Sequence, residues 1–329
     1  MYSRTTQCKN FGPHAPLALQ LFTYFRRLAL IDFFLSLQPA VQAAIVAAIV
    51  SVLTAILSTP LRYAIDKRAL RHKLSIEYEY EQRKQLRHLI GRFHGRLIEA
   101  SEQINFRLWN LYTNHGEPWL TVRGDYSEPT KNYYFTSTAY RFLAVLAHVR
   151  RFEMESIYID SRIAEAKDLE FLKYLKALQW VCTDVSLFKG LKYDSNYSTD
   201  HFFSDTLRQI CDSCWRDNQF LSIQEFQTRM TTEPLFEPVL HFFDGLNPEE
   251  NRYRWDRFVC FHLLILAFSN SFGYEMRKTT DDQLLEVAQK ILHNQIRSNL
   301  TFWIAKLGLS DQKEVKALLQ ALAGGAKGG

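Results

Sequence analysis

Residues Phe33–Leu61 read FFLSLQPAVQAAIVAAIVSVLTAILSTPL and contain no Asp, Glu, Lys, Arg or His. A helix needs about 20 apolar residues to cross the hydrocarbon core of a membrane, within a range of about 17–25. The sequence therefore predicts a transmembrane helix at residues 39–61. A buried core helix is the alternative, but it would need a large globule around it. A cleaved signal peptide is disfavoured, because its apolar part would begin close to the N-terminus.

Basic residues flank the predicted span unequally. Two of them, Arg26 and Arg27, precede it closely, and five follow it: Arg62, Lys67, Arg68, Arg71 and Lys73. Basic residues near the ends of a span mark the cytoplasmic side, and they attract anionic lipid by about 1 kcal/mol each. We therefore expect a single-pass protein of the inner (plasma) membrane. Its C-terminal body would be cytoplasmic, with the five residues at the membrane surface.

Composition limits the class of the remaining chain. The net charge of +5 over 329 residues lies largely in the basic run after the span, so the overall charge does not demand a nucleic-acid partner. The sparse Gly and Pro residues are typical of a helical protein. The five cysteines are an odd number without disulfide-like spacing, which favours a reducing compartment.

The hydrophobic pattern predicts an all-α fold, in which a single transmembrane helix continues into a multi-helix cytosolic bundle. Residues 1–38 would form an interfacial or membrane-adjacent helix, although Leu17–Leu37 could instead be a second membrane segment. Residues 62–114 are expected to form a long juxtamembrane helix, and residues 115–322 the helical cytosolic domain, with one helix over 280–297. Residues 323–329 would be a flexible tail.

Two apolar patterns predict the core of the body. One face of the long helix carries apolar residues at steps of three, four or seven: Leu86, Ile90, Phe93, Leu97, Ala100, Ile104 and Leu111. Packing against its own domain is the preferred interpretation, and a self-associating coiled coil is the alternative. The short apolar run Phe258–Phe268, which contains His262, is expected at the centre of the cytosolic core.

The spacing of Cys211 and Cys214 is that of a metal-binding CxxC pair. A structural zinc ion needs four ligands, usually from a second pair at a recognisable spacing. The sequence has no second pair, and His201 could complete a site only through tertiary contacts. Two cysteines one helical turn apart can also share a buried face. We therefore predict neither a metal nor a cofactor.

An arginine followed by a histidine after four to six residues resembles the signature of HEPN ribonucleases, which are small all-helical domains. Four pairs match: Arg83/His88, Arg87/His94, Arg141/His148 and Arg257/His262. About two such pairs are expected by chance. The resemblance implies that Arg257 would hold a phosphate of RNA and His262 would manage the 2′-hydroxyl proton, across a dimer. The alternative is a core histidine beside an interfacial arginine.

The segment Tyr133–Ile159 opens with Tyr-Tyr-Phe-Thr-Ser-Thr-Ala-Tyr-Arg-Phe-Leu. It resembles a family of uncharacterised bacterial proteins that have one N-terminal span and a helical body. The resemblance extends from the span to about Arg229. It implies a bacterial host and this topology, but no reaction and no functional residue.

These patterns favour a membrane-anchored interaction or scaffold protein over an enzyme. Its expected partners are the lipid bilayer, a second copy of the chain and another protein, within a bacterial defence or stress system. Small residues in the span permit close helix contact and an oligomer: Ala43, Ala44, Ala47, Ala48 and Ser51. A membrane-tethered HEPN-like ribonuclease, with RNA as partner, is one alternative. A pore-forming or membrane-perturbing effector is the other.

Overall fold

The computed structural model describes residues 32–157, 160–196, 199–250 and 252–325. Most of the predicted N-terminal helix, and most of the predicted tail, lie outside these residues. The chain divides into two compact units, with the boundary between Glu77 and Tyr78. The second unit thus begins inside the predicted juxtamembrane helix. The described chain is almost wholly helical, which confirms the all-α class.

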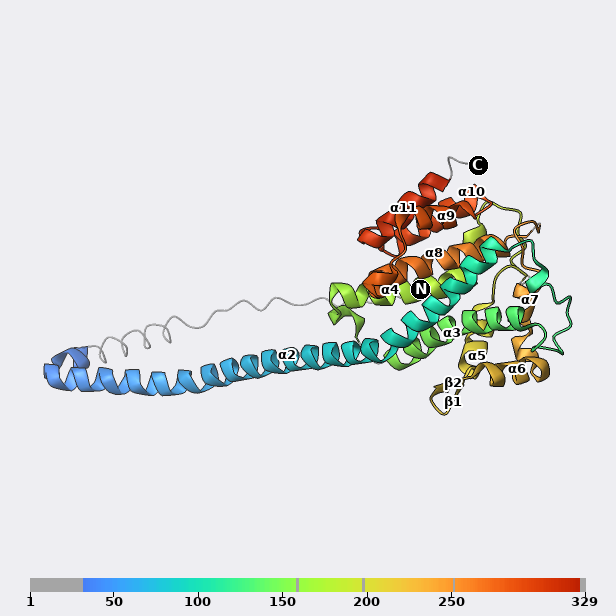
Figure 1. Ribbon diagram of the computed structural model, residues 1–329. Coiled ribbons are helices and arrows are strands. Elements are labelled where there is room, and N and C mark those ends of the chain that lie inside the picture. The colour runs from blue at the N-terminus through green and yellow to red at the C-terminus, as the bar shows by residue number, and fades with distance from the viewer. Residues whose placement is uncertain (1–31, 158–159, 197–198, 251, 326–329) are drawn as a thin grey trace, which may run out of the picture. The chain divides into compact units, whose positions relative to one another are not determined.

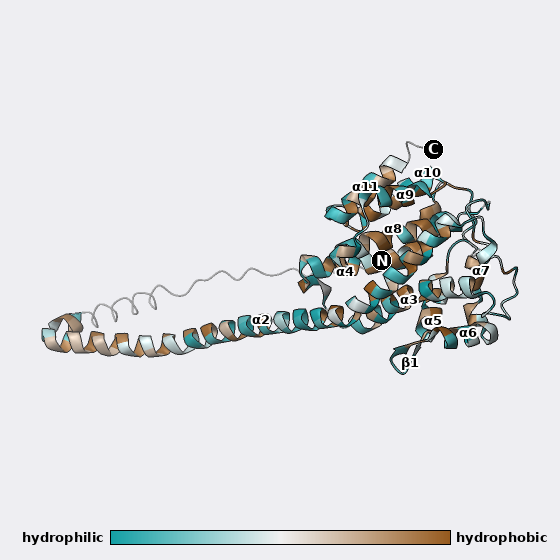
Figure 2. Ribbon diagram, in the orientation of Figure 1, coloured by the Kyte–Doolittle hydropathy of each residue, from teal (hydrophilic) through white to brown (hydrophobic). Residues whose placement is uncertain are grey.

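Helix α2 (Pro39–Thr113) is continuous and contains Pro60. It includes the predicted span and the predicted juxtamembrane helix in one element, drawn from blue to teal in Figure 1. Figure 2 shows brown and pale residues in its first part and hydrophilic teal residues further along. Among the described residues, α2 is the one helix long and apolar enough to cross a membrane, and its apolar window is not buried by the chain.

A short helical segment at residues 32–36 precedes α2. The side-chain amide of Gln42 turns back to it and donates to the carbonyl oxygens of Phe34 (3.0 Å) and Leu37 (3.0 Å). The last carbonyl oxygens of a helix lack partners within it, and that of Phe34 also accepts from the backbone N–H of Leu37 (3.3 Å). Gln42 is the one amide side chain within the predicted span, and these bonds satisfy its N–H donors within the chain.

In the part of the chain that the structure describes, the second unit contains the C-terminal part of α2 and the helices α3 to α11 (Figure 1). The α-helices are α3 (Tyr133–Ser156), α4 (Ala166–Thr183), α5 (Ser204–Ser213), α6 (Ile223–Thr232), α7 (Glu237–Phe243), α8 (Arg254–Phe272), α9 (Asp281–Gln289), α10 (Asn294–Lys306) and α11 (Lys313–Gly325). Short 3₁₀ turns are η1 (Pro118–Leu120), η2 (Ser161–Ile163), η3 (Val185–Phe188), η4 (Pro234–Phe236) and η5 (Glu275–Arg277). The two-residue strands β1 (Trp215–Arg216) and β2 (Gln219–Phe220) pair antiparallel, with Trp215 opposite Phe220.

Helix α8 lies at the centre of the second unit. All side chains of Phe258–Phe268 are buried, and the helix packs against α4, α9 and α11. The apolar face of α2 is also part of this core: its predicted residues are buried, except for Ile90, which is partly buried. Both predicted core patterns are thus confirmed, and the face of α2 packs against its own domain.

The prediction of one helix over residues 280–297 is wrong, because the chain turns between α9 and α10. Thr280 starts α9 with a capping box, and the helix ends at Gln289. The buried carboxylate of Asp256, on α8, accepts hydrogen bonds from the backbone N–H groups of Leu292 (2.7 Å) and His293 (3.2 Å). It also contacts Nδ1 of His293 at 2.5 Å. These bonds fix the turn at the start of α10, and periodicity within residues 280–297 could not show them.

Candidate functional site

Arg257, the predicted phosphate-binding residue, lies in the core with 1% of its surface exposed. Its guanidinium group donates to the carbonyl oxygens of Val181 and Asp184 (3.0 Å for Asp184) at the C-terminal end of α4. It also lies 4.3 Å from the centre of the Phe188 ring. Burial lowers the pKa of Arg257 to about 10, so the group stays charged. A cation at this position stabilises the negative end of the helix dipole.

His262, the predicted proton-transfer residue, is completely buried and faces α2. Its Nε2 donates to the side-chain oxygen of Asn105 (2.8 Å), so Nδ1 accepts from the hydroxyl of Tyr112 (2.9 Å). Burial lowers the pKa of His262 to about 3, which keeps the ring neutral at physiological pH. A general acid or base works best with a pKa near the operating pH.

The structure therefore does not bring Arg257 and His262 together in one site. Arg257 contacts α4 and η3, whereas His262 contacts α2. Residues five apart on a helix are turned by about 140° from each other, which explains the separation. A side chain of each remaining arginine/histidine pair is bound to a backbone carbonyl: Arg83 to that of Ile163, His94 to that of Phe272 and His148 to that of Ala144.

The CxxC cysteines are part of the core. Cys211 and Cys214 are buried, and burial raises the pKa of the Cys214 thiol to about 12. A thiol must lose its proton to bind a metal. His201 instead contacts the hydroxyl of Tyr193 through Nδ1. Within the described ranges, no group of three or more His, Cys, Asp or Glu side chains is arranged to hold a metal ion.

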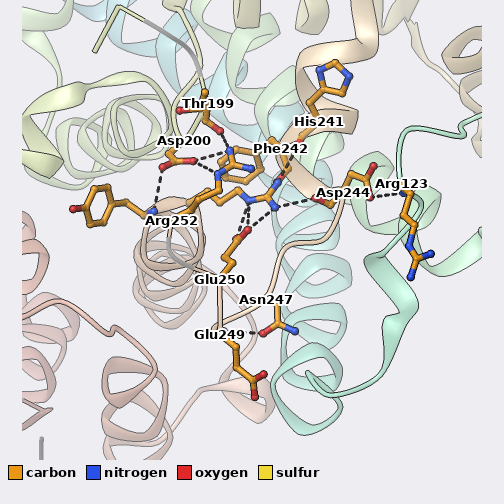
Figure 3. Close-up of polar contacts among 12 residues, drawn as sticks. Arg123, Thr199, Asp200, His241, Phe242, Asp244, Asn247, Glu249, Glu250 and Arg252 are labelled. Carbon is orange, nitrogen blue, oxygen red and sulfur yellow. Dashed lines mark hydrogen bonds and ion pairs between the residues drawn. The ribbon is translucent and has the colours of Figure 1, made fainter. Parts of the chain in front are cut away.

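A dense polar network joins the loop before α3 to the connection between α7 and α8 (Figure 3). The carboxylate of Asp244 accepts from the backbone N–H groups of Val122 (2.8 Å), Arg123 (3.0 Å) and Gly124 (2.7 Å). Arg123 and Gly124 have positive φ angles of 59° and 78°, so the carboxylate holds a tight left-handed turn.

Arg254 completes this network from the buried side. It donates to the carbonyl oxygens of His241 (2.7 Å), Phe242 (2.8 Å) and Asp244 (2.9 Å), and it pairs with the carboxylate of Glu250 (2.6 Å). Every one of these contacts is internal to the fold. The network in Figure 3 therefore positions loops of the fold.

A hollow of the second unit lies along α3 and α4. It has a volume of about 780 Å³ and adjoins a second hollow of about 440 Å³, with which it shares Arg150, Lys176, Gln179 and Leu307. We call the two together the α3–α4 groove. The wall of the larger hollow is mostly apolar: Leu86, Val149, Phe152, Met154, Ile157, Leu169, Leu172 and Leu175. The smaller hollow includes Trp180 and Trp303, whose rings stack with centres 3.5 Å apart.

A polar bridge crosses the groove between the two hollows. The carboxylate of Glu153 accepts from Lys176, from Gln179 (3.0 Å) and from Arg150 (3.2 Å), and Arg150 also binds Asp212 (2.9 Å). Burial alone would raise the pKa of Glu153, but the hydrogen bonds from Lys176 and Gln179 outweigh it and lower the pKa to about 2. The bridge therefore stays ionised and ordered at neutral pH.

Sequence reasoning missed the groove, because its residues come from several helices (α2, α3, α4, α5 and α10) and match no motif. One signal was present. Arg150 and Glu153 are three residues apart on α3, and so are Lys176 and Gln179 on α4, which puts each pair on one helix face. Polar side chains three apart, inside otherwise apolar faces, could have indicated a bridge between the helices.

The predicted membrane-surface residues are all exposed on α2: Arg62, Lys67, Arg68, Arg71 and Lys73. Successive residues of a helix are turned by about 100°, so these side chains project to all sides of α2 rather than to one face. A helix lying flat in a membrane surface would carry its basic residues on one face. The arrangement is that of a ring around the helix.

Comparison of the chain with protein-family models, with curated proteins and with solved structures finds no significant match. The resemblance of residues 133–159 to a bacterial membrane-protein family stays a prediction. The function is therefore argued from the exposed apolar helix and the groove.

Proposed function

We propose that this chain is a membrane-anchored binding protein. Residues 39–61 of α2 would cross the bilayer, and the helical second unit would hold a partner protein at the membrane. The supporting observation is that the apolar part of α2 is left bare by the rest of the described chain.

The exposure of this segment is costly in water. Seven aliphatic side chains are between 49% and 65% exposed: Val46, Ile49, Val50, Val52, Leu53, Ile56 and Leu57. Burying one such side chain is worth about 1.5–3 kcal/mol, so leaving all seven in water forgoes about 10 kcal/mol. A lipid environment removes this cost.

The polar groups of the segment do not oppose insertion. The Ser51 hydroxyl donates to the carbonyl oxygen of Ala47 (2.7 Å), and the Thr54 hydroxyl donates to that of Val50 (2.7 Å). Hydrocarbon offers no hydrogen bonds, so a span must satisfy its donors internally. At about 1.5 Å per residue, residues 39–61 extend about 34 Å, which is enough for a hydrocarbon core of about 30 Å.

The ring of basic residues supports a crossing helix with the second unit on the cytoplasmic side. Side chains on all sides of a helix can contact lipid headgroups together only where the helix passes through the surface. The excess of positive charge after the span favours the cytoplasm for that end.

The α3–α4 groove is the surface that we assign to the partner, as the receptor for an amphipathic helix with an acidic flank. Its apolar wall suits the apolar face of such a helix. Its lining includes four cations: Arg150, Lys173, Lys176 and Arg208. Three of them are paired within the fold: Arg150 with Glu153 and Asp212, Lys176 with Glu153, and Arg208 with Asp205. Lys173 donates to the backbone carbonyl of Gly308 (2.7 Å), and its charge would favour acidic residues beside the apolar face of the partner.

Membrane anchoring is tested by placing charge in the span. The double variant Ile49→Lys/Leu53→Lys adds about 5–7 kcal/mol to the cost of insertion, at about 2.5–3.5 kcal/mol per lysine. Leu70→Lys/Leu74→Lys is the matched control, because it makes the same exchange on exposed positions of the same helix. After an alkaline carbonate wash, we expect the wild type and the control in the membrane pellet and the span variant outside it. A wild type that washes off, or equal loss of both variants, would contradict the proposal.

The groove is tested with two labelled model helices that share a leucine face and carry either glutamate or lysine on the flank. The full chain in detergent should bind the acidic helix, and Leu172→Asp should weaken this binding at least tenfold. Leu292→Asp, at an exposed position on the loop before α10, is the control and should bind normally. If both helices bind equally well, or if both variants lose binding of the acidic helix equally, the groove is not the binding surface that we propose.

A further inference from the structure

Two half-buried arginines from different helices meet at one buried serine of the second unit. Arg107, on α2, donates through Nη2 to the hydroxyl of Ser137 (2.8 Å). Arg141, on α3, donates through Nη1 to the backbone carbonyl of the same serine (3.0 Å). Partial burial lowers the pKa of Arg107, and the charge of Arg141 lowers it further, so the two cations repel each other.

The charge of this arginine pair is not balanced by a carboxylate. In the part of the chain that the structure describes, neither Arg107 nor Arg141 forms an ion pair. Two acidic residues near them in sequence are already engaged: Glu102 pairs with Arg277 (2.6 Å), and Glu128 pairs with Lys131 (2.5 Å). Two partly buried, adjacent cations without a counter-charge make a site that gains stability when an anion binds.

The electrostatic effect of the pair is visible at a neighbouring hydroxyl. Tyr133 is the first residue of α3, and the hydrogen bond and charge of Arg141, together with the charge of Arg107, lower the pKa of Tyr133. The site thus favours negative charge even on a tyrosine. The N-terminal end of α3 adds to this field, because Asn132 makes no side-chain cap there.

Aromatic rings lie beside Arg107. The guanidinium carbon of Arg107 lies 3.8 Å from the centre of the Tyr134 ring and 6.0 Å from that of Tyr133. The ring of Trp119 lies 4.6 Å from that of Tyr134. Tyr133 is 50% exposed and Trp119 is 37% exposed, so both leave ring surface open to solvent in this aromatic cluster.

We propose that Arg107, Arg141 and Ser137, with the rings of Trp119 and Tyr133, form a binding site for a nucleotide. The two guanidinium groups would hold the phosphate, because each keeps N–H donors that Ser137 does not use and planar guanidinium groups match phosphate oxygens. The exposed ring surface would stack on the base, which any nucleobase permits. The site is separate from the α3–α4 groove and does not depend on membrane anchoring.

The site is tested by titrating the full chain in detergent with AMP, adenosine, inorganic phosphate and a five-nucleotide RNA. Calorimetry and tryptophan fluorescence give the affinities. We expect AMP to bind at one site, more tightly than phosphate or adenosine, and with an affinity that falls as salt rises. Arg141→Gln and Arg107→Gln should each weaken AMP binding at least tenfold. Trp119→Ala should weaken AMP binding but leave phosphate binding unchanged.

Arg216→Gln is the charge-matched control, because it removes an exposed arginine on β1, outside the α3–α4 groove. Circular dichroism identifies any variant that fails to fold. If Arg107→Gln fails to fold, Arg141→Gln and Trp119→Ala still test the site. Absence of AMP binding, or equal weakening by Arg216→Gln, would overturn the site. Equal affinity for phosphate and AMP would overturn the role of the rings. RNA binding more than tenfold tighter than AMP, through the same arginines, would replace the nucleotide with single-stranded RNA.

Discussion

Acidification will destabilise the helical second unit, and His262 will supply a defined part of the effect. Histidine in an unfolded chain has a pKa of about 6.5, whereas burial lowers the pKa of His262 in the folded chain to about 3. Between these values the unfolded chain binds a proton that the folded chain does not, so stability falls as the pH falls. At about 1.4 kcal/mol per pH unit, His262 removes about 2 kcal/mol between pH 7 and pH 5.

Denaturant unfolding of the full chain in detergent measures this loss. All six tryptophans lie between Trp109 and Trp303, so their fluorescence reports the second unit alone. The variant His262→Gln cannot gain the proton. It will be less stable at pH 7, since Asn105 and Tyr112 lose a fitted partner, but its stability should fall by about 2 kcal/mol less than that of the wild type on acidification.

His115→Gln serves as the control, because it removes an exposed histidine from the same unit. His201, whose pKa burial lowers to about 4, contributes to the acid sensitivity of both wild type and variant and cancels in the comparison. Equal pH dependence in wild type and His262→Gln would refute the reasoning. It would mean that His262 titrates near neutral pH, as the ribonuclease interpretation requires.

Four other changes give measurable outcomes. Arg257→Met should cost about 2–4 kcal/mol in denaturant unfolding, because the carbonyl groups at the end of α4 lose their donors; an unchanged midpoint would disprove its capping role. Asp256→Ala should cost about 1–3 kcal/mol and speed hydrogen exchange at residues 292 and 293, and normal exchange there would count against it. Asp244→Ala should speed exchange at residues 122–124 at least tenfold, and exchange at the wild-type rate would contradict the role of this carboxylate in the turn. Ala47→Leu should reduce cross-linked dimers in detergent if small residues pack between spans; undiminished dimers would argue against that interface.

The features that the sequence predicted correctly depend on residues close together in the chain. The exposed apolar part of α2 follows from composition alone, and the buried face of Leu86–Leu111 follows from helical spacing. The run Phe258–Phe268 was expected in the core because it is too short to span a membrane. Each of these patterns can be recognised before the tertiary structure is known.

The features that the sequence did not predict depend on distant residues. The turn between α9 and α10 is fixed by Asp256, which belongs to α8. The groove needs α3 and α4 side by side, and the arginine pair needs α2 beside α3. The spacing of Arg257 and His262 matched the ribonuclease signature, but two residues five apart on one helix point toward different neighbours. Their proximity in sequence therefore did not become proximity at a shared surface.

Burial of the thiols has a practical consequence. Cys182, Cys211, Cys214 and Cys260 are all free and inaccessible in the folded chain, and burial raises their pKa values. An alkylating reagent can modify these four positions only when the second unit opens. The rate of their modification would therefore measure how often the second unit opens. A ligand that stabilises the folded unit would lower this rate, so its binding could be detected before its identity is known.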